Sequence, residues 1–469
     1  MIDQVEVLTA GLFEQADAGY EVGAKLVAAV LIWSLKAGEC PPTIISIVTF
    51  RPAKSYNVYI DGFRLGEGSG HMSTTVVTNI GVLVEGIPGR GPLRDTSLVI
   101  EDGVISAVGD EVSGADIVVD AAGLTVIPGL VDGHVHPTVG EWTPAQNASG
   151  WIRNYLHGGT TSMVSAGELH LPGLPLGDLT PSIVTSLALT IRASTAGTRP
   201  SGVKALFGTA LLVPGMSEAD FDRLASAGVR QVKFIFYDWG RLGDGEAQRY
   251  VSWAHERSMV VKMHSGGVSR SGSSRVAGYD VVVAVQPDVI AHMSGGPIPM
   301  PRDELARTID DAPLAAIEIC SSMNYRASID VVAHLLEIGR VDRLTLGTDT
   351  PGGTGVIPRG MLRNICLLAS VCGLAPIDAI AAATGNTARV HGLDVGILAP
   401  GYPGDLVVLG PVMGSAGNDA LESFALGDLP GISAVLIDGK PLISGRSEQT
   451  PPPRMLATVK IFHAPGEEL

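Results

Sequence analysis

Six side chains of the kinds that bind or activate metal ions are spread along the middle of this chain. Two of them, His134 and His136, follow an apolar run that breaks at Pro128–Gly129 and resumes at Leu130. Side chains two positions apart on a β-strand point to the same face, so these imidazoles could hold one ion together. Four further apolar runs end in a residue of this kind: Lys233, His264, His292 and Asp349. The pattern predicts a metal site built from several strands.

The intervals between these residues match the length of strand–helix units. Lys233 and His264 are 31 residues apart, and His264 and His292 are 28 apart, so each interval fits one unit. His136 precedes Lys233 by 97 residues, about three units. Asp349 follows His292 by 57 residues, about two units. The residues therefore fall on strands 1, 4, 5, 6 and 8 of an eight-unit series, at the carboxyl ends where barrel enzymes place their catalytic groups.

Short apolar runs that alternate with helical stretches predict a parallel sheet of βα units across residues 128–392. Besides the run that contains His134, the expected strands are Thr160–Ser165, Val203–Phe207, Val229–Phe236, Met259–His264, Asp288–His292, Ala315–Ile319 and Leu344–Asp349. Eight units over roughly 265 residues fit a (β/α)₈ barrel, which typically has about 250 residues. We therefore expect an α/β fold of the TIM-barrel type.

Short alternating runs separated by glycine turns flank this region on both sides. They occupy residues 72–127 and return over 393–469, which predicts one β-sandwich domain built from both chain ends. Residues 1–71 differ from this pattern, and Gly68–Met72 resembles a cloning scar. We interpret residues 1–71 as an extension, either a tag or fusion with no part in the chemistry or an ordinary helical segment.

The composition limits the partners that the chain can have. The net charge is -16 and there is no basic run, which argues against nucleic acid or an anionic membrane as a partner. The longest apolar run near the N-terminus, Leu26–Leu35, is too short to cross a bilayer. The four cysteines form no CxxC pair, which suits a reducing compartment. We expect a cytoplasmic protein whose partner is a small molecule.

On these residues the chain resembles the amidohydrolase superfamily, metal-dependent hydrolases with a (β/α)₈ barrel and a flanking β-sandwich. Pro128–His136 is similar to the family's first-strand motif, and Leu398–Val408 is similar to its return into the sandwich. The resemblance extends from Met72 to the C-terminus. It implies two divalent metals, with Zn²⁺ expected and Fe²⁺ or Mn²⁺ as alternatives.

The resemblance also implies a role for each of the six residues. The more buried metal would be bound by His134, His136 and Asp349, the second by His264 and His292, and an N-carboxylated Lys233 would bridge both. Neutral imidazole suits Zn²⁺ or Fe²⁺, whereas a lysine binds metal only after it loses its charge and reacts with CO₂. Two metals sharing one water would give a bridging hydroxide near neutral pH, and Asp349 would act as general base and then acid in amide hydrolysis.

Taken singly, the six residues have ordinary explanations. His264 alone would be a hydrogen-bonded core histidine, Lys233 a strand lysine reaching solvent, and Asp349 the N-cap of a helix. Their joint occurrence in order at barrel spacing favours the metal site. A single-metal enzyme of this fold would not need Lys233.

The loops after the strands resemble those of enamidase, a family of homotetramers that opens a cyclic enamide at a binuclear metal centre. The similar segments are Ala166–Gly173, His264–Gly267, His292–Pro297 and Asp349–Pro358. The resemblance implies a cyclic amide or enamide substrate and a homo-oligomer. Arginine can pair with a substrate carboxylate through two hydrogen bonds. The candidate substrate contacts, each of which would also suit an ordinary surface position, are His170, Arg270, Arg275 and Arg359.

Two rival classes of function remain open. One is another carbon–nitrogen hydrolase of the same fold, hydantoinase-like or acting on aryl amides, with the same ligands and different loops. The other is a non-catalytic scaffold protein, against which the intact set of ligands speaks. A deaminase fits less well because those enzymes usually use one metal without a bridging lysine, and Lys233 is present here.

Overall fold

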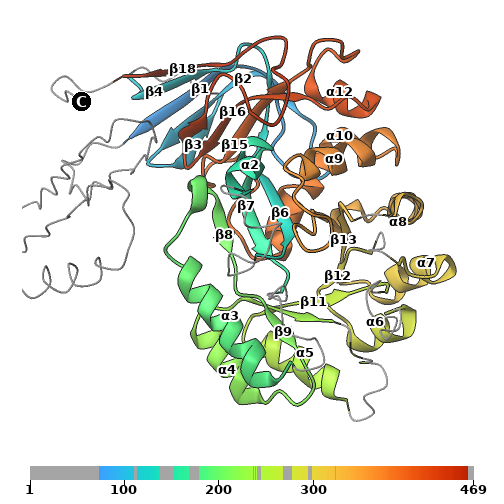
Figure 1. The fold of residues 1–469 in the computed structure, drawn as a ribbon. Coiled ribbons are helices and arrows are strands. Elements are labelled where there is room, and N and C mark those ends of the chain that lie inside the picture. The colour runs from blue at the N-terminus through green and yellow to red at the C-terminus, as the bar shows by residue number, and fades with distance from the viewer. Residues whose placement is uncertain are drawn as a thin grey trace, which may run out of the picture. The chain divides into compact units, whose positions relative to one another are not determined.

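The computed structural model describes residues 73–109, 114–137, 151–167, 179–235, 237, 239, 245–267, 277–293, 298–322 and 324–462. The extension predicted over residues 1–71 lies outside these ranges. The described chain contains one mixed nine-stranded sheet and a series of parallel strands that alternate with helices (Figure 1). Within these residues, no helix combines the length and the apolar character needed to cross a membrane.

The mixed sheet draws its strands from both ends of the described chain. Its earlier strands are β1 (Thr74–Leu83), β2 (Leu93–Glu101), β3 (Val104–Val108), β4 (Ile117–Asp120) and β5 (Thr125–Pro128). Its later strands are β15 (Leu406–Gly410), β16 (Gly431–Ile437), β17 (Lys440–Ile443) and β18 (Thr458–Ile461). The order is β17-β16-β15-β5-β1-β2-β3, and β4 pairs with both β1 and β18. Antiparallel pairing of β5 with β15 therefore joins the two ends in one sheet.

This sheet branches at β1 and has a core of its own. The first half of β1 pairs in parallel with β4, its last residues pair in parallel with β5, and β2 lies antiparallel to it. Buried apolar side chains from β1, β2, β15 and β16 pack in one cluster, which includes Val77, Leu98, Val408 and Leu436. The pairing shows one branched sheet, and a two-layer sandwich stays a prediction.

The parallel strands form two sheets in sequence order. The first contains β6 (Leu130–Val135), β7 (Thr160–Ser165) and β8 (Lys204–Leu206). The second contains β9 (Ala210–Leu212), β10 (Gln231–Phe234), β11 (Val260–His264), β12 (Val289–Ala291), β13 (Ala316–Cys320) and β14 (Leu344–Gly347). Each of the eight predicted runs overlaps one of these strands, and β9 is an additional short strand.

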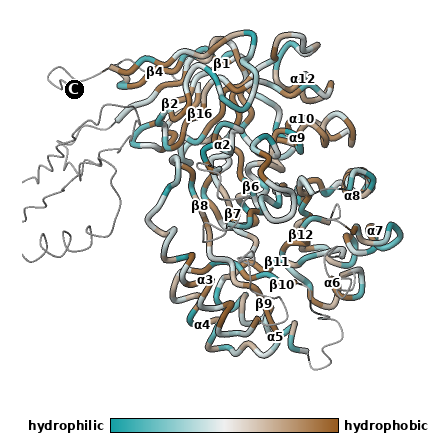
Figure 2. Tube along the Cα trace, viewed as in Figure 1, coloured by the Kyte–Doolittle hydropathy of each residue, from teal (hydrophilic) through white to brown (hydrophobic). Residues whose placement is uncertain are grey.

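Helices alternate with the parallel strands as far as β14 and lie outside them (Figure 1), further helices follow β14, and the last described helix lies between β15 and β16 of the mixed sheet. They are α2 (Trp151–His157), α3 (Pro181–Thr195), α4 (Glu218–Ser226), α5 (Glu246–Glu256), α6 (Tyr279–Val285), α7 (Arg302–Asp311), α8 (Tyr325–Glu337), α9 (Gly360–Ser370), α10 (Pro376–Ala382), α11 (Gly385–Val390) and α12 (Ala420–Leu426), with short 3₁₀ turns η2 (Pro200–Gly202) and η3 (Val341–Arg343). Thr180 caps α3, and Ser217 and Asp220 form a capping box at α4. In Figure 2 hydrophobic residues follow the strands, and hydrophilic residues gather on outer turns such as those of α7 and α8.

A break follows the third predicted strand, Val203–Phe207, and separates β8 from the additional strand β9. β8 pairs with β7 and β9 pairs with β10, while Gly208 between them has a φ of 100°. A Cβ on Gly208 would lie 2.7 Å from the Cβ of Arg192, so only glycine lets α3 pack this closely. The hydroxyl of Thr209 spans the break by donating to the carbonyl oxygen of Ser165, 2.6 Å away at the end of β7.

The outer strands β6 and β14 meet without forming a ladder among the described residues. Just beyond β14, the backbone N–H of Asp349 donates to the carbonyl oxygen of His134 at 2.8 Å. The N–H of His136 donates to the carbonyl oxygen of Thr350 at 2.6 Å. Asp349 has a φ of 60°, a left-handed conformation that ends an extended strand. The structure therefore shows an α/β fold with two parallel sheets and not the closed eight-stranded ladder that we predicted.

The hydroxyl of Tyr155 in α2 is hydrogen-bonded to the segment that follows β14, and we expect these hydrogen bonds to stabilise the fold. The side chain is fully buried, its hydroxyl bonds to Thr350, and it accepts a hydrogen bond of 2.7 Å from the backbone N–H of Ile357. Tyr155→Phe leaves those partners without it, which should cost about 1–3 kcal/mol of unfolding free energy in urea denaturation. The control Tyr325→Phe changes a side chain that is 63% exposed and should have little effect. Equal stabilities of the two variants would contradict this role.

Candidate metal centre

The structure brings the six predicted residues together at the carboxyl ends of the parallel strands. They come from the ends of β6, β10, β11, β12 and β14, in the order His134 and His136, Lys233, His264, His292 and Asp349. Gly129 lets the start of β6, the strand that carries His134, pack closely against Thr161, because a Cβ at this position would lie 2.1 Å from the Thr161 hydroxyl. At Gly129 the chain leaves the mixed sheet at the end of β5 and enters the parallel set as β6.

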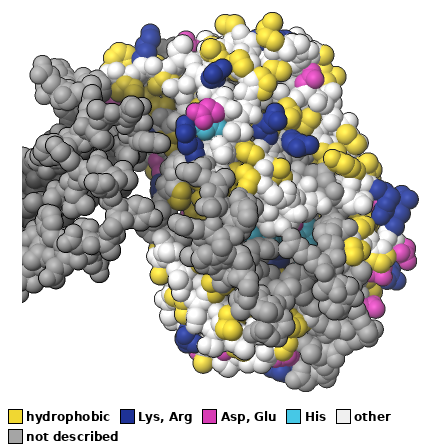
Figure 3. Space-filling model, viewed as in Figure 1, with side chains coloured by type: hydrophobic (Ala, Val, Ile, Leu, Met, Phe, Trp, Pro, Cys, Tyr) yellow, Lys and Arg dark blue, Asp and Glu magenta, His cyan; other side chains and the backbone are white. Residues whose placement is uncertain are grey.

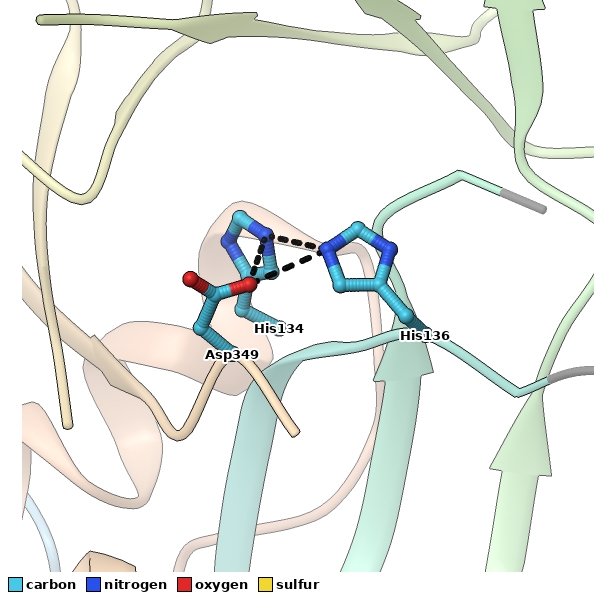
Figure 4. A group of neighbouring side chains, drawn as sticks. All are labelled: His134, His136 and Asp349. Carbon is cyan, nitrogen blue, oxygen red and sulfur yellow. Dashed lines mark hydrogen bonds and ion pairs between the residues drawn. The ribbon is translucent and has the colours of Figure 1, made fainter. Parts of the chain in front are cut away.

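Three of the side chains converge on one point (Figure 4). The Nε2 atoms of His134 and His136 are 3.2 Å apart. The Oδ1 atom of Asp349 lies 3.1 Å from Nε2 of His136 and 3.6 Å from Nε2 of His134. All three side chains are buried, and their ligand atoms lie close enough together to hold a single ion.

The hydrogen bonds of the two imidazoles fix where their lone pairs point. Nδ1 of His134 is 2.5 Å from Oε1 of Glu318, and Nδ1 of His136 is 2.9 Å from the carbonyl oxygen of Gly167. Because ionised carboxylates and carbonyls only accept hydrogen bonds, both Nδ1 atoms carry the proton. Both Nε2 lone pairs therefore face each other and the Asp349 carboxylate. Such a set repels itself unless a cation lies between its members, so the donors fit a divalent metal ion.

Lys233 contributes its amine to the same point. Its Nζ atom lies 2.9 Å from Nε2 of His134, and the residue is 2% exposed. Burial lowers the pKa of Lys233 to about 8, although the nearby Asp349 carboxylate acts in the opposite direction. A substantial share of this amine is therefore neutral in mildly alkaline solution, and the neutral form is the one that can react with CO₂. A strand lysine reaching solvent is not what the structure shows.

His264 and His292 extend the cluster away from the convergence point. Their ring centroids are 4.5 Å apart, and the His292 ring is 5.4 Å from that of His134. Burial lowers the pKa of His292 to about 4 and holds that of His264 well below its usual value, so both rings are neutral. Nδ1 of His292 is buried and has no hydrogen-bond partner among the described residues. A neutral ring with an unpartnered nitrogen suits a metal ligand.

Asp349 is held as a carboxylate. Burial by itself would raise the pKa of Asp349, but its close polar interactions with His136, His134 and His292 outweigh burial and hold that pKa well below its usual value. Its place is set by the residue before it, because the backbone N–H and hydroxyl of Thr348 donate to Asp132 at 2.9 and 2.6 Å. The site therefore offers an ionised carboxylate in a fixed position.

Three buried charged residues beside the cluster were missed by the sequence reasoning. Asp132 and Lys262 precede His134 and His264 by two positions, so the two-residue period of a strand could have indicated them. Glu318 is on β13, a strand for which we predicted no site residue. With His134 and Cys320, Glu318 also lies close enough to hold an ion, but its carboxylate is already paired with Lys262.

Of the four predicted substrate contacts, only Arg359 lies among the residues that the structure describes. His170, Arg270 and Arg275 lie outside the described residues. Arg359 is exposed and immediately precedes α9, so its role as a substrate contact stays a prediction.

The cluster is not completely sealed, because His264 is partly exposed and histidine surface is visible near the middle of the face in Figure 3.

Gly353 keeps Asp349 in place, and we expect Gly353→Ala to disturb the site more than the fold. A Cβ on Gly353 would lie 1.9 Å from Oδ2 of Asp349, whereas the backbone there does not require glycine. The carboxylate would have to move, so Zn²⁺ affinity by calorimetry should fall at least about tenfold while the melting temperature changes little. In the control Gly197→Ala the new methyl group meets open space. Unchanged Zn²⁺ affinity in Gly353→Ala would contradict the geometry.

Comparison with known proteins shows which protein family has this arrangement. Residues 246–442 match the amidohydrolase family. An enamidase from Eubacterium barkeri is 39% identical over 398 residues, which cover 83% of this chain and 100% of that protein. Adenine deaminase 3 of Rhizobium meliloti is 29% identical over 62% of this chain and 47% of its own length.

Solved structures give the same result for the fold. The crystal structure of enamidase, described as a member of the amidohydrolase superfamily, superposes with a TM-score of 0.76 at 38% identity and covers 83% of this chain and all of that one. A D-hydantoinase structure superposes with a TM-score of 0.59 at 16% identity, over 81% of this chain and 97% of that one, a likeness of fold alone. With this extent of identity and these buried histidine and aspartate side chains, the chain belongs to the amidohydrolase superfamily, as an enzyme related to enamidase.

Proposed function

We propose that this enzyme hydrolyses the carbon–nitrogen bond of a cyclic amide or enamide with two divalent metal ions at the carboxyl ends of its parallel strands. One observation carries the proposal: two imidazole lone pairs and an ionised carboxylate converge in a buried space beside the amine of Lys233. The 39% identity with an enamidase along that protein's whole length supports the class of substrate.

In this proposal each residue of the cluster has one task. One metal ion is held by His134, His136 and Asp349, the other by His264 and His292, and an N-carboxylated Lys233 bridges them. When bound, such ions lower the pKa of a water molecule and polarise a carbonyl oxygen. Asp349, held ionised, accepts the proton of the attacking water and passes it to the leaving nitrogen, so that the ring opens to a carboxylate and an amine, or an enamine where the substrate is an enamide.

The buried lysine distinguishes this proposal from a single-metal deaminase, but not from other hydrolases of the same fold. A deaminase with a single metal has no use for a lysine amine 2.9 Å from a ligand nitrogen in a position that is 2% exposed. A hydantoinase-like or aryl-amide hydrolase would use the same residues, so only the substrate separates those activities from ours. A non-catalytic scaffold would have no reason to keep an ionised carboxylate and neutral imidazoles together in a buried space.

We further propose Zn²⁺ as the metal, a homotetramer as the assembly and the cytoplasm as the location. Imidazole nitrogens and one carboxylate oxygen form a donor set that suits Zn²⁺. The assembly rests on the resemblance to enamidase, and mass photometry of the purified protein would test it.

The first test is the substrate range of the purified, metal-loaded protein. We expect about two metal ions per chain by elemental analysis and turnover of six-membered lactams and enamides in preference to cyclic imides and anilides. Removal of metal with a chelator should abolish turnover, and added Zn²⁺ should restore it. Preferred turnover of cyclic imides would favour the hydantoinase-like alternative. Fewer than about one metal per chain together with no hydrolysis would favour the scaffold alternative.

The second test concerns the bridging role of Lys233. We expect Lys233→Ala to lower kcat/KM at least about 100-fold, because the loss of a shared ligand should exceed the loss of a ligand's supporting partner. Short carboxylates such as acetate or propionate should restore part of the rate by occupying the vacated position. The control Lys440→Ala, at an exposed position of β17, should keep its rate and should not respond to acetate. Full activity of Lys233→Ala without added carboxylate would disprove the bridge.

A further inference from the structure

A buried lysine–glutamate pair lies against the cluster and takes no part in the chemistry proposed above. Nζ of Lys262 is 2.9 Å from Oε2 of Glu318, and both side chains are 0% exposed. Burying two charges is costly, and well-packed hydrophobic residues often stabilise a protein equally well or better. The pair therefore needs an explanation other than stability.

Glu318 receives donors from several elements at once. Its Oε1 atom lies 2.5 Å from Nδ1 of His134, 3.3 Å from the backbone nitrogen of His292 and 3.5 Å from Sγ of Cys320. Its Oε2 atom accepts from Lys262. A lysine ammonium can only donate, so it favours the ionised carboxylate, which can only accept. Glu318 therefore requires a proton on Nδ1 of His134.

Lys262 contacts the chain immediately before the same histidine. Besides Glu318, its Nζ atom donates to the carbonyl oxygen of Gly133. The pair thus holds His134 at two places, through the ring nitrogen by Glu318 and through the adjacent peptide by Lys262. These contacts connect β6 to β11 and β13, two strands that share no ladder with β6.

We propose that Lys262 and Glu318 are positioning residues that fix His134 as the Nδ1–H tautomer and aim its Nε2 lone pair at the metal. Glu318 selects the tautomer of His134, and Lys262 holds both Glu318 and the Gly133 peptide in place beside that histidine. The inference rests on the proposed metal site, but the tautomer exists in the metal-free protein and can be measured there.

The first measurement uses the wild-type, metal-free protein labelled with ¹⁵N-histidine. Long-range ¹H–¹⁵N correlation spectra distinguish the two neutral tautomers, and the signal that disappears in His134→Gln identifies His134. We expect the Nδ1–H tautomer. An Nε2–H tautomer in the wild-type protein would overturn the proposal, whatever happens in any variant.

The second measurement compares two double variants from which both charges have been removed. Lys262→Met with Glu318→Gln keeps an acceptor for Nδ1 of His134, whereas Lys262→Met with Glu318→Leu does not. We expect Zn²⁺ affinity to fall about 10–100-fold in the leucine variant and less in the glutamine variant. The leucine variant should also lose the Nδ1–H signature of His134. Wild-type Zn²⁺ affinity in the leucine variant would overturn the positioning role.

A matched ion pair elsewhere in the chain separates positioning from simple structural support. Lys204 Nζ lies 2.7 Å from Oδ2 of Asp405, whose side chain is 1% exposed. Lys204→Met should lower the melting temperature without changing Zn²⁺ affinity or the His134 signal. An equal loss of Zn²⁺ affinity in Lys204→Met would show that general loosening accounts for the effect and would overturn the proposal. A wild-type protein that binds no Zn²⁺ would instead overturn the proposed function, and the tautomer would still decide the positioning role.

Discussion

The site depends on the close approach of β6 to the segment that follows β14. Two backbone hydrogen bonds, from Asp349 to His134 and from His136 to Thr350, hold the first and last parallel strands together at the level of the cluster. They place a carboxylate beside two imidazoles that come from more than two hundred residues away in the chain. The left-handed conformation of Asp349 turns its side chain toward them instead of continuing the strand. Two side chains stabilise this contact: Asp132 is hydrogen-bonded to Thr348, and Tyr155 is hydrogen-bonded to Thr350. They therefore support the site as well as the fold.

The buried polar residues around the cluster follow from the geometry of parallel strands. Side chains two positions apart share a face, so a strand that carries a ligand at its end also carries a residue beneath it on the same face. In β11 that residue is Lys262 beneath His264, and in β10 it is Gln231 beneath Lys233. Gln231 is hydrogen-bonded to His391 at 2.9 Å, and Lys262 is paired with Glu318. Polar groups are costly in such a place unless they are paired, and each of these side chains has at least one partner, although Oε1 of Gln231 has none among the described residues.

The sequence predicted much of this arrangement because its signals are local. Apolar runs of strand length recur at intervals of one βα unit, and the ends of parallel strands meet at one edge, so spacing alone indicated that Lys233, His264 and His292 would be neighbours. The position of Glu318 was not predictable in this way, because it lies on a strand without a ligand at its end and its partners come from β6 and β11. The additional strand β9 after Gly208 was also missed, since the break before it reflects the close packing of α3 and not a local propensity.

By itself, the sequence determined the order of the parallel strands, the six side chains that come together and the end of the strands at which they lie. These features depend on the two-residue period of strands and on the length of repeated units, both of which can be read along the chain. Only the tertiary structure decided which nitrogen of each imidazole faces the cluster, because that choice is made by acceptors distant in sequence, such as Glu318 for His134 and Gly167 for His136. It also decided how the parallel strands meet, since the contact of β6 with the residues after β14 is made by backbone groups whose conformation no side-chain pattern specifies.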